Sequence, residues 1–368
     1  MPTQKTNVSG DIAGISYSVP GLTWKINKGV KVSGNGFGVE SQFANSKLVN
    51  SGKVTGGEAG AFFNVLGGRT VVDNKKSGTL ESGSSGTGLF ISDPLGSAQI
   101  TNAGKISGAL GAYVFTTSDV TFDNQGSIKA IVTAIMLPSL AAGSKNAVIQ
   151  NHGKIDGGNS GIYAGGADGV SLKVVNHKGA TIQADFAAIV SLVRLDLKND
   201  GKIKGYVASL ATSDKVINKG SMGDVSLGGG NDVYKAKGKG KAGMIDLGEG
   251  NDLAVLGKKA DKLLFDSALN AATNVDTVKK FKSGKDKFYL DEDIFTGIAP
   301  GKLQSSAFHQ GTQAKDADDR IIYDKKTGAL YYDPDGAGGV AQTKFAQLDK
   351  GTKLKASDFM VGEYSLFP

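Results

Sequence analysis

Short apolar runs recur along the first two thirds of the chain, and each runs into a phrase of the form apolar-x-Asn-x-Gly-x-apolar. The clear copies read KLVNSGKV, ITNAGKI, FDNQGSI, IQNHGKI, LKNDGKI and VINKGSM, and looser copies read INKGVKV, VDNKKSGTL and VNHKGATI. Their asparagines are Asn27, Asn50, Asn74, Asn102, Asn124, Asn151, Asn176, Asn199 and Asn218. Successive asparagines lie 19 to 28 residues apart. A period in this range predicts a solenoid.

The residue types within each repeat indicate which kind of solenoid forms. Each repeat holds short β-branched runs and glycines without helical periodicity, so we expect one coil of a parallel β-helix per repeat. Residues two positions before the asparagine would form one internal column: Leu48, Val72, Ile100, Phe122, Ile149, Val174, Leu197 and Val216. Residues four positions after it would form a second: Val54, Ile106, Ile128, Ile155 and Ile203. The asparagines would stack as a hydrogen-bonded ladder, and the following glycine would supply the turn conformation.

Composition agrees with a fold of many tight turns. The chain has 54 glycines in 368 residues, about twice the average usage. It has no Gly-X-Y period, and 39% hydrophobic residues are too many for a disordered chain. We therefore predict an all-β fold built as a parallel β-helix of about ten coils. The repeated phrase resembles those of right-handed β-helix passengers and haemagglutinin-like surface proteins over roughly residues 7–226, which implies a right-handed coil.

Several classes of protein are excluded by what the sequence lacks. With no cysteine, disulfides, thiolate zinc sites and thiol nucleophiles are ruled out, so stability must come from a long core, a bound metal or both. The start of the chain, MPTQKTNVSGDIAG, has neither a basic nor an apolar signal region, and we expect no Sec signal peptide. No apolar run reaches about 18 residues, so we expect no membrane span.

The charge pattern bears on the choice of partner. The formal net charge is +7, and 39 of the 42 basic residues are lysine; the exceptions are Arg69, Arg194 and Arg320. Proteins that recognise nucleic acid favour arginine for bidentate and stacking contacts, so we expect no nucleic-acid binding. Scattered lysines are typical of a solvated surface and of guarded strand edges. Acidic polysaccharide or lipopolysaccharide is the more plausible polyanionic partner.

Two further phrases carry the candidate metal chemistry, GDVSLGGGNDVY and GMIDLGEGNDLAVLG. They resemble the glycine- and aspartate-rich nonapeptides of RTX proteins, the calcium-dependent cargoes of type I secretion. The resemblance implies calcium as the bound ion, with ligand turns at Gly228, Gly230, Asp232, Gly248, Gly250 and Asp252. Both copies depart from the motif at its first glycine, where Leu227 and Leu247 stand.

The spacing of the two copies predicts how they would be arranged. Asp232 and Asp252 lie 20 residues apart, about one coil, so the turns should stack on one edge and hold one or two calcium ions between them. The alternative is that LGxGND forms a tight turn and binds nothing.

The C-terminal third loses the Asn-Gly phrase. Its segments VDTVKKFKSGKDKFYLDEDIF and DDRIIYDKKTGALYYDPDGAGG resemble the C-terminal regions of type I secreted RTX proteins, which carry an uncleaved export signal. That resemblance implies export from a Gram-negative bacterium to the cell surface or the medium. RIIYDKKTGALYY predicts a β-hairpin around Lys325–Gly328. The predicted domains are a β-helix at 1–222, calcium-binding coils at 223–257, and a β-rich region with the secretion signal at 258–368.

Some polysaccharide lyases, hydrolases and epimerases also have the β-helix fold, and such an enzyme would need polar residues clustered on neighbouring coils. The residues directly after the ladder asparagines would place His152, His177 and Asp200 on adjacent coils, a spacing that suits metal ligands or an acid–base pair. The competing interpretation is a row of exposed polar turn residues. No nucleophile elbow, P-loop or dinucleotide motif occurs in a suitable context.

Three functional hypotheses remain at the level of the sequence. The first is an extracellular calcium-binding structural protein that self-assembles into a surface layer, a fibre or a biofilm component. The second is a lyase or epimerase that acts on acidic glycans. The third is an adhesin or toxin-like secreted cargo. The sequence favours a structural role over an enzyme, with other copies of the chain as the main partner.

Overall fold

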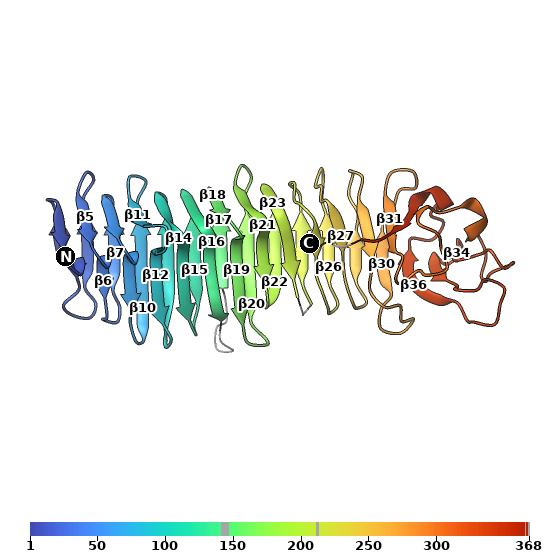
Figure 1. Cartoon of the computed structure of the whole chain (residues 1–368), viewed down its shortest axis with the longest axis horizontal. Coiled ribbons are helices and arrows are strands. Elements are labelled where there is room, and N and C mark those ends of the chain that lie inside the picture. Colours follow the sequence, from blue (N-terminus) through green and yellow to red (C-terminus); the bar gives the residue numbers. More distant parts are fainter. Residues whose placement is uncertain (141–146, 211–212, 365, 367–368) are drawn as a thin grey trace. The chain divides into compact units, whose positions relative to one another are not determined.

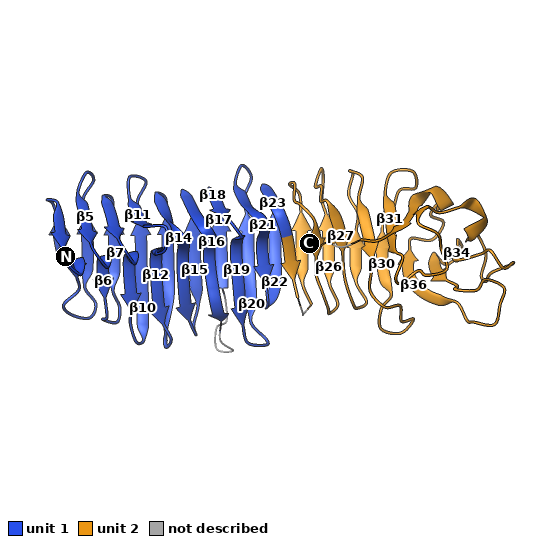
Figure 2. Ribbon diagram, in the orientation of Figure 1, with its two compact units in different colours: residues 1–206 blue, residues 207–368 orange. Residues whose placement is uncertain are grey.

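A computed structural model of the chain describes residues 1–140, 147–210, 213–364 and 366. It is all-β, with 55% strand and 2% helix, and forms a parallel β-solenoid of about 12 turns (Figure 1). The predicted fold class is confirmed. Two compact units make up the chain, unit 1 (Met1–Tyr206) and unit 2 (Val207–Pro368) (Figure 2). The predicted domain boundaries at 222 and 257 stay predictions.

The strands of unit 1 lie in three parallel stacks. In the first stack the strands from β7 onwards each end at an asparagine. This stack contains β1 (Thr3–Gln4), β4 (Thr23–Ile26), β7 (Lys47–Asn50), β10 (Gly68–Asn74), β13 (Gly96–Asn102), β15 (Val120–Asn124), β17 (Ala147–Asn151), β20 (Ser171–Asn176) and β22 (Arg194–Asn199). The second contains β2 (Val8–Gly10), β5 (Lys31–Gly34), β8 (Lys53–Gly56), β11 (Thr79–Ser82), β14 (Lys105–Thr116), β16 (Ser127–Leu140), β18 (Lys154–Gly157) and β21 (Thr181–Ser191). The third contains β3 (Ala13–Ser16), β6 (Phe37–Ser41), β9 (Ala59–Asn64), β12 (Thr87–Asp93) and β19 (Ser160–Gly166), together with the far ends of the long strands β14, β16 and β21.

The core is built from the two predicted apolar columns. In the first stack Ile100 pairs with Phe122, and Phe122 pairs with Ile149; all three are fully buried. In the second stack Ile106 pairs with Ile128 and Ile128 with Ile155, and these are buried as well. Burial of each such side chain away from water contributes about 1.5–3 kcal/mol to the stability of the fold. The looser repeats complete the second column with residues that were not predicted: Val32, Leu80 and Ile182.

The asparagines form the predicted ladder in unit 1 from Asn50 onwards, whereas the prediction is wrong for Asn27, because Ile26 is the residue that pairs with Asn50. Each Nδ2 donates to the Oδ1 of the asparagine one coil further on, at 2.7 to 2.9 Å, through Asn50, Asn74, Asn102, Asn124, Asn151, Asn176 and Asn199. The second amide hydrogen donates to a backbone carbonyl of the next coil; the Nδ2 of Asn124 lies 3.2 Å from the carbonyl oxygen of Lys154. All seven residues are fully buried. A buried polar side chain must find partners, and here every coil supplies the partner of the one before.

The glycine after each asparagine is needed for a reason that differs from the prediction. At Gly126 an added Cβ would lie 2.1 Å from the carbonyl oxygen of Gly104, and at Gly153 it would lie 2.0 Å from that of Gly126. Neither glycine has a positive φ. The left-handed conformation occurs only in the looser repeats, at Gly29 (φ 82°) and Gly179 (φ 89°), where the space around the Cβ position is open. In the compact turns, glycine therefore serves close packing between coils.

Unit 2 continues parallel stacking with shorter strands. One stack contains β24 (Lys215–Asn218), β26 (Val233–Ala236), β28 (Leu253–Val255), β30 (Asp276–Lys279) and β36 (Thr343–Leu348). The other contains the last residues of β23 (Lys202–Ser209), then β25 (Val225–Ser226), β27 (Met244–Asp246), β29 (Lys262–Phe265), β31 (Lys287–Asp291) and β37 (Phe359–Gly362). Coils thus persist beyond Gly257, where the repeated phrase ends.

The C-terminal segments pack as a small antiparallel sheet. The predicted hairpin is confirmed, because β34 (Ile321–Asp324) pairs antiparallel with β35 (Ala329–Tyr332). Strand β35 also pairs antiparallel with β36. The remaining short elements are β32 (Gly301–Lys302), β33 (Phe308–His309), and the 3-10 helices Ser305–Ala307 and Ala356–Asp358. None of the helices in the described residues is long and apolar enough to cross a membrane.

We expect Asn124→Ala to lower the free energy of unfolding of the protein by about 2–4 kcal/mol, because one buried amide hydrogen of Asn102 loses its acceptor and the buried Oδ1 of Asn151 loses a donor. Urea unfolding followed by circular dichroism measures the change. The control is Gln125→Ala, at an exposed neighbour, which should stay within about 0.5 kcal/mol of the wild type. Equal effects of the two substitutions would show that the ladder contributes no stability.

Gly126→Ala should be more destabilising than Gly179→Ala. The first forces a methyl group against a backbone carbonyl, which costs about 3 kcal/mol or more. The second only adds a side chain to a left-handed residue in open space, which costs about 1–2 kcal/mol. The same unfolding experiment ranks them. The reverse order would mean that backbone conformation, and not space between coils, selects glycine after the asparagine.

Candidate metal centre

The two glycine-rich phrases form equivalent turns in unit 2. Residues 227–232 connect β25 to β26, and residues 247–252 connect β27 to β28. Within them φ is positive at all four predicted glycines, 76° and 121° at Gly228 and Gly230, and 85° and 145° at Gly248 and Gly250. Residues other than glycine rarely adopt this backbone conformation. The repeated glycines therefore give both turns the same path.

The two turns stack directly on each other. The backbone N–H of Glu249 donates to the carbonyl of Gly228 (2.8 Å), and that of Gly230 donates to the carbonyl of Glu249 (2.9 Å). An added Cβ at Gly248 would lie 1.7 Å from the Gly228 oxygen, and one at Gly250 would lie 1.8 Å from the Gly230 oxygen. Backbone oxygens of the first turn thus occupy the space that a side chain of the second would fill. The predicted one-coil stacking is confirmed.

A column of aspartates lies where each turn enters the next strand. The backbone N–H of Asp214 donates to Asp232 Oδ1 (2.6 Å), and that of Asp232 donates to Asp252 Oδ1 (2.7 Å). The N–H of Asp252 is 3.3 Å from Asp276 Oδ1. All four aspartates are buried. This column is an acidic counterpart of the asparagine ladder, in which Asp232, Asp252 and Asp276 each accept a backbone N–H from the coil before.

The second oxygens of the two predicted aspartates are unsatisfied. In the described part of the chain, Oδ2 of Asp232 and Oδ2 of Asp252 are buried and accept no hydrogen bond. Burial raises the pKa of Asp232 to about 8 and that of Asp252 to about 6, although backbone N–H groups oppose the rise. Burial, followed by the charge of Asp252, also raises the pKa of Asp276 well above its ordinary value. After burial, the charges of neighbouring aspartates also raise the pKa values of Asp232 and Asp276.

A second group of carboxyls lies beside the same turns. Asp246 accepts hydrogen bonds from the Ser226 hydroxyl (2.7 Å) and the Gly248 N–H (2.9 Å). Burial and then the charge of Asp266 raise the pKa of Asp246 to about 7. A cavity of about 10 Å³ is lined by these two carboxyls, by Asp276 and by apolar side chains. Its volume suits one water molecule or one small ion.

The donor chemistry of this region fits calcium. Calcium takes six to eight oxygen ligands from carboxylates and backbone carbonyls. The stacked turns present buried carboxylate oxygens and glycine carbonyls and no nitrogen or sulfur ligand. Among the described residues, no three acidic or histidine side chains converge to form a ligand set by themselves. Backbone carbonyls of the turns would have to supply the remaining ligands.

The six predicted residues lie together, and the structure adds others to them. Asp214 and Asp276 extend the aspartate column, and Asp246 and Asp266 form the adjoining pair. Sequence reasoning missed Asp214 and Asp276 because the residues before them, TS and NV, lack the glycine pattern by which the motif was found.

The histidine column forms a polar row in which His152 is exposed and His177 and Asp200 are half-buried. The imidazoles of His152 and His177 stack with centroids 3.7 Å apart. His177 Nε2 is 2.8 Å from Gln150 Oε1, and His152 Nε2 is 3.9 Å from Asp123 Oδ1. The Asp200 carboxylate lies 3.6 Å from the ammonium group of Lys198. Burial and then the charge of His152 lower the pKa of His177. The structure stacks the two histidines and places Asp200 beside Lys198, where its charge still acts on His177.

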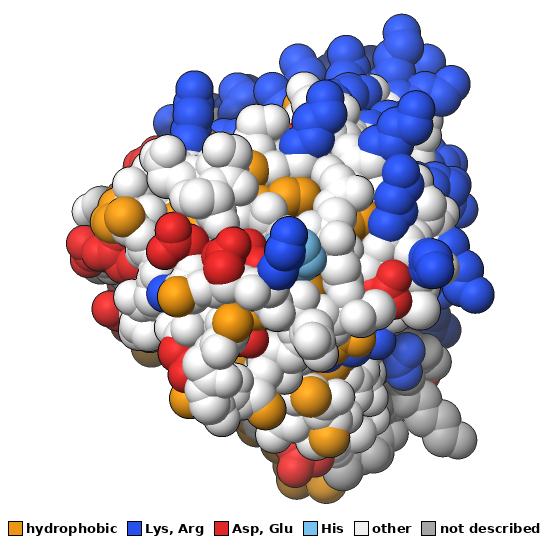
Figure 3. Space-filling model, turned by 90° about the vertical axis from the view of Figure 1, so that its right-hand side faces the viewer, with side chains coloured by type: hydrophobic (Ala, Val, Ile, Leu, Met, Phe, Trp, Pro, Cys, Tyr) orange, Lys and Arg blue, Asp and Glu red, His pale blue; other side chains and the backbone are white. Residues whose placement is uncertain are grey.

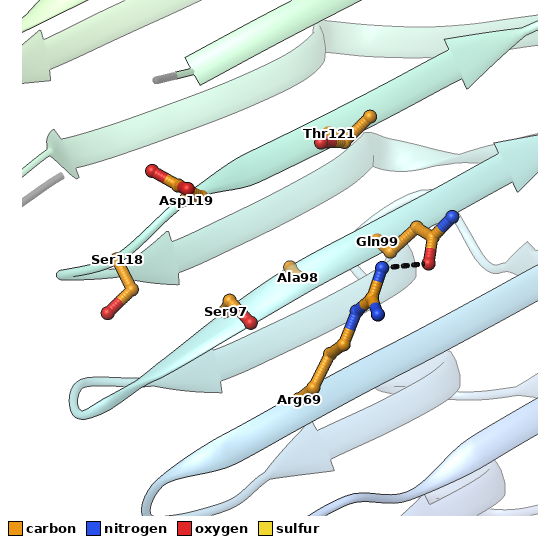
Figure 4. A pocket seen from close by; sticks show the side chains of 7 residues that line it. All are labelled: Arg69, Ser97, Ala98, Gln99, Ser118, Asp119 and Thr121. Carbon is orange, nitrogen blue, oxygen red and sulfur yellow. Dashed lines mark hydrogen bonds between the residues drawn. The ribbon is translucent and has the colours of Figure 1, made fainter. Parts of the chain in front are cut away.

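A shallow depression on the first strand stack of unit 1 offers polar groups to solvent (Figure 4). Its volume is about 430 Å³, and it is lined by Arg69, Ser97, Ala98, Gln99, Ser118, Asp119 and Thr121. The Arg69 guanidinium donates to Gln99 Oε1. The Asp119 carboxyl points away from that pair (Figure 4). Charged groups here do not converge as an acid–base pair would.

An aromatic row on the third stack is also accounted for by packing. The rings of Phe37, Phe62, Phe90 and Tyr113 stack in sequence with centroids 4.2 to 4.9 Å apart. Their faces cover one another, so only ring edges are left for a ligand. Binding of a sugar ring by stacking needs an open aromatic face. This row stabilises neighbouring coils and is a poor sugar platform.

Comparison with protein-family models finds none that matches the chain, and comparison with curated proteins and with solved structures finds no match either.

Proposed function

We propose that this protein is an extracellular structural protein that binds calcium at the stacked turns 227–232 and 247–252 and self-assembles once unit 2 is ordered. The observation that carries the proposal is the pair of buried, unsatisfied oxygens on Asp232 and Asp252 beside glycine carbonyls of stacked turns. The similarity of the C-terminal segments to type I secreted RTX proteins supports a location outside the cell.

Electrostatics explain why an ion would matter for folding. Buried carboxylates with raised pKa values cost folding free energy when they ionise at neutral pH. A divalent cation placed between Asp232 and Asp252 would compensate both charges and use their free oxygens. At a calcium concentration 100 times the dissociation constant, binding to the folded state alone adds about 2.7 kcal/mol of stability. Low calcium would leave these coils loosely folded, and high calcium would order them.

The features of the solenoid favour assembly over catalysis. Coils at the end of a β-solenoid offer backbone groups that another chain can pair with. Apolar side chains are exposed in unit 1, with Ile12 and Leu66 each 69% exposed and Leu95 68% exposed. Exposed apolar groups on a soluble protein often mark contacts with partners. Other copies of the chain are the partner that this proposal names.

We predict opposite effects of Asp252→Asn with and without calcium. In a chelator the variant should be as stable as the wild type or more stable, because it removes a buried charge and keeps the acceptor oxygen for the Asp232 N–H. In millimolar calcium it should lose most of the stabilisation that the wild type gains. Thermal unfolding across a calcium titration measures both effects.

The matched control is Asp224→Asn, on the other edge of the same unit. Its carboxylate accepts one backbone hydrogen bond, from Met244 (2.6 Å), and should not affect the response to calcium. A wild-type protein that calcium leaves unchanged would refute the calcium proposal. A full calcium response in Asp252→Asn would remove that residue from the site.

Negative-stain electron microscopy tests the structural role. We expect ordered sheets or filaments when purified protein is taken from chelator into millimolar calcium, and dispersed particles for Asp232→Asn with Asp252→Asn. Dispersed wild-type particles at every calcium concentration would refute self-assembly while leaving calcium binding intact.

A further inference from the structure

Unit 2 carries a run of exposed lysines along one of its edges. They lie in four turns, at residues 219–224, 237–243, 256–261 and 280–286. We call this surface the lysine edge, and its exposed members are Lys219, Lys237, Lys239, Lys241, Lys258, Lys259, Lys280 and Lys282. The calcium-type turns 227–232 and 247–252 lie at the other end of the strands.

Hydrogen bonds between the turns hold these lysines in register. The backbone N–H of Lys241 donates to the carbonyl of Gly220, and that of Met222 donates to the carbonyl of Lys241, both at 2.9 Å. Further along, the ammonium group of Lys282 lies 3.2 Å from the carbonyl oxygen of Gly257. Because coils in a parallel stack repeat about every 4.8 Å, the edge presents a closely spaced line of positive charge.

One partly exposed acid reaches this line from outside the four turns, because Asp349 lies 3.2 Å from the Lys279 ammonium group and accepts the Lys280 N–H (2.7 Å). The acids of the four turns are Asp224, which is partly exposed, and Asp261 and Asp286, which are buried. Each accepts a backbone N–H, as Asp261 does from Gly257 (2.9 Å) and Asp286 from Lys282 (2.8 Å). Asp261 and Asp286 therefore hold the turns from inside, although their charges also act on Lys282 and Lys285.

The positive edge results from segregation of charge and not from an excess of it. Val207–Pro368 contains 23 lysines and arginines and 22 aspartates and glutamates. Figure 3 shows Lys and Arg gathered along the upper and right-hand margins of that view, and Asp and Glu mainly towards the left. Lysines placed only for solubility would not need to share one edge, where they repel each other.

We propose that the lysine edge binds a linear acidic polysaccharide that runs along the stacked turns. A polymer with regularly spaced carboxylates matches a line of ammonium groups and releases their counterions on binding. This assignment rests on the proposed extracellular function, because such polymers lie outside the cell and because ordered coils keep the lysines in register.

Other polyanionic partners fit this surface less well. The only aromatic residue of the four turns is Phe281, which is buried, so bases of a nucleic acid find no stacking partner. The exposed large apolar side chains that unit 2 shows among its described residues, Leu210 and Val340, lie outside these turns. A peripheral membrane site usually combines basic and apolar groups. Charge without aromatic or apolar neighbours points to a polysaccharide.

The test compares hyaluronan binding by the wild type and by a triple variant, Lys237→Gln, Lys239→Gln and Lys241→Gln, in millimolar calcium and low salt. Hyaluronan is a soluble polymer of carboxylated sugars, and neutral dextran is the uncharged comparison. We expect the variant to bind hyaluronan about 100-fold more weakly, with a shallower dependence on salt. Dextran should not bind to either protein.

The matched control removes three charges elsewhere in unit 2, by Lys325→Gln, Lys326→Gln and Lys350→Gln. These lysines are exposed in turns of the C-terminal sheet, so the net charge changes equally in both variants. The control should bind hyaluronan within about twofold of the wild type. Equal weakening in the two variants would overturn the assignment, since it would show that only overall charge matters.

Two other results would also overturn the proposal. One is the absence of hyaluronan binding by a wild type whose unfolding temperature rises with calcium, which would leave the calcium proposal standing. The other is binding of duplex DNA or anionic lipid vesicles through the same three lysines when hyaluronan does not bind. Conversely, a protein that binds hyaluronan through the edge but shows no response to calcium would refute the calcium site alone.

Discussion

A buried amide that must both donate and accept can be satisfied inside an apolar core by another amide placed at the same position one coil away. In unit 1 this requirement is met through seven asparagines whose hydrogen bonds all run in one direction along the chain. A shift of one residue in any coil would break the ladder and expose an apolar column as well, because alternate residues of a strand face opposite sides. The amide ladder and the apolar columns therefore stabilise the same register of the strands. That register also sets the positions of the outer rows of aromatic, histidine and lysine side chains.

Unit 2 replaces the neutral ladder by a charged one. Asparagine can be stacked indefinitely, because its two ends are complementary, whereas a stacked carboxylate offers only acceptors. Asp232 and Asp252 each satisfy one oxygen with a backbone N–H and leave the other buried without a hydrogen bond. A ladder of this kind is stabilised either by protonation of its carboxyls or by a cation. An amide and a carboxylate in similar surroundings thus differ in whether the chain alone supplies all their partners.

Much of unit 1 could be predicted from the sequence because one phrase repeats. Asn102, Asn124 and their neighbours keep the same spacing to the core residues on both sides, and their placement was predicted correctly. Leu80 and Ile182 were missed because two extra turn residues move them out of the pattern. The role of Gly126 was misjudged, since contact with the next coil is visible only in three dimensions. In unit 2, Asp276 was missed because its position depends on stacking and not on a local motif.

The one-way hydrogen bonding of the asparagine ladder also affects how such a gene can change. Each asparagine receives a bond from the coil before and gives one to the coil after, so the two faces of a coil are complementary and every coil presents the same pair of faces. An internal coil copied in frame would find the same partners at its two new boundaries, and one deleted in frame would leave a matched joint. Recombination between repeats could lengthen or shorten unit 1 in steps of one coil without a new core or a new turn having to arise.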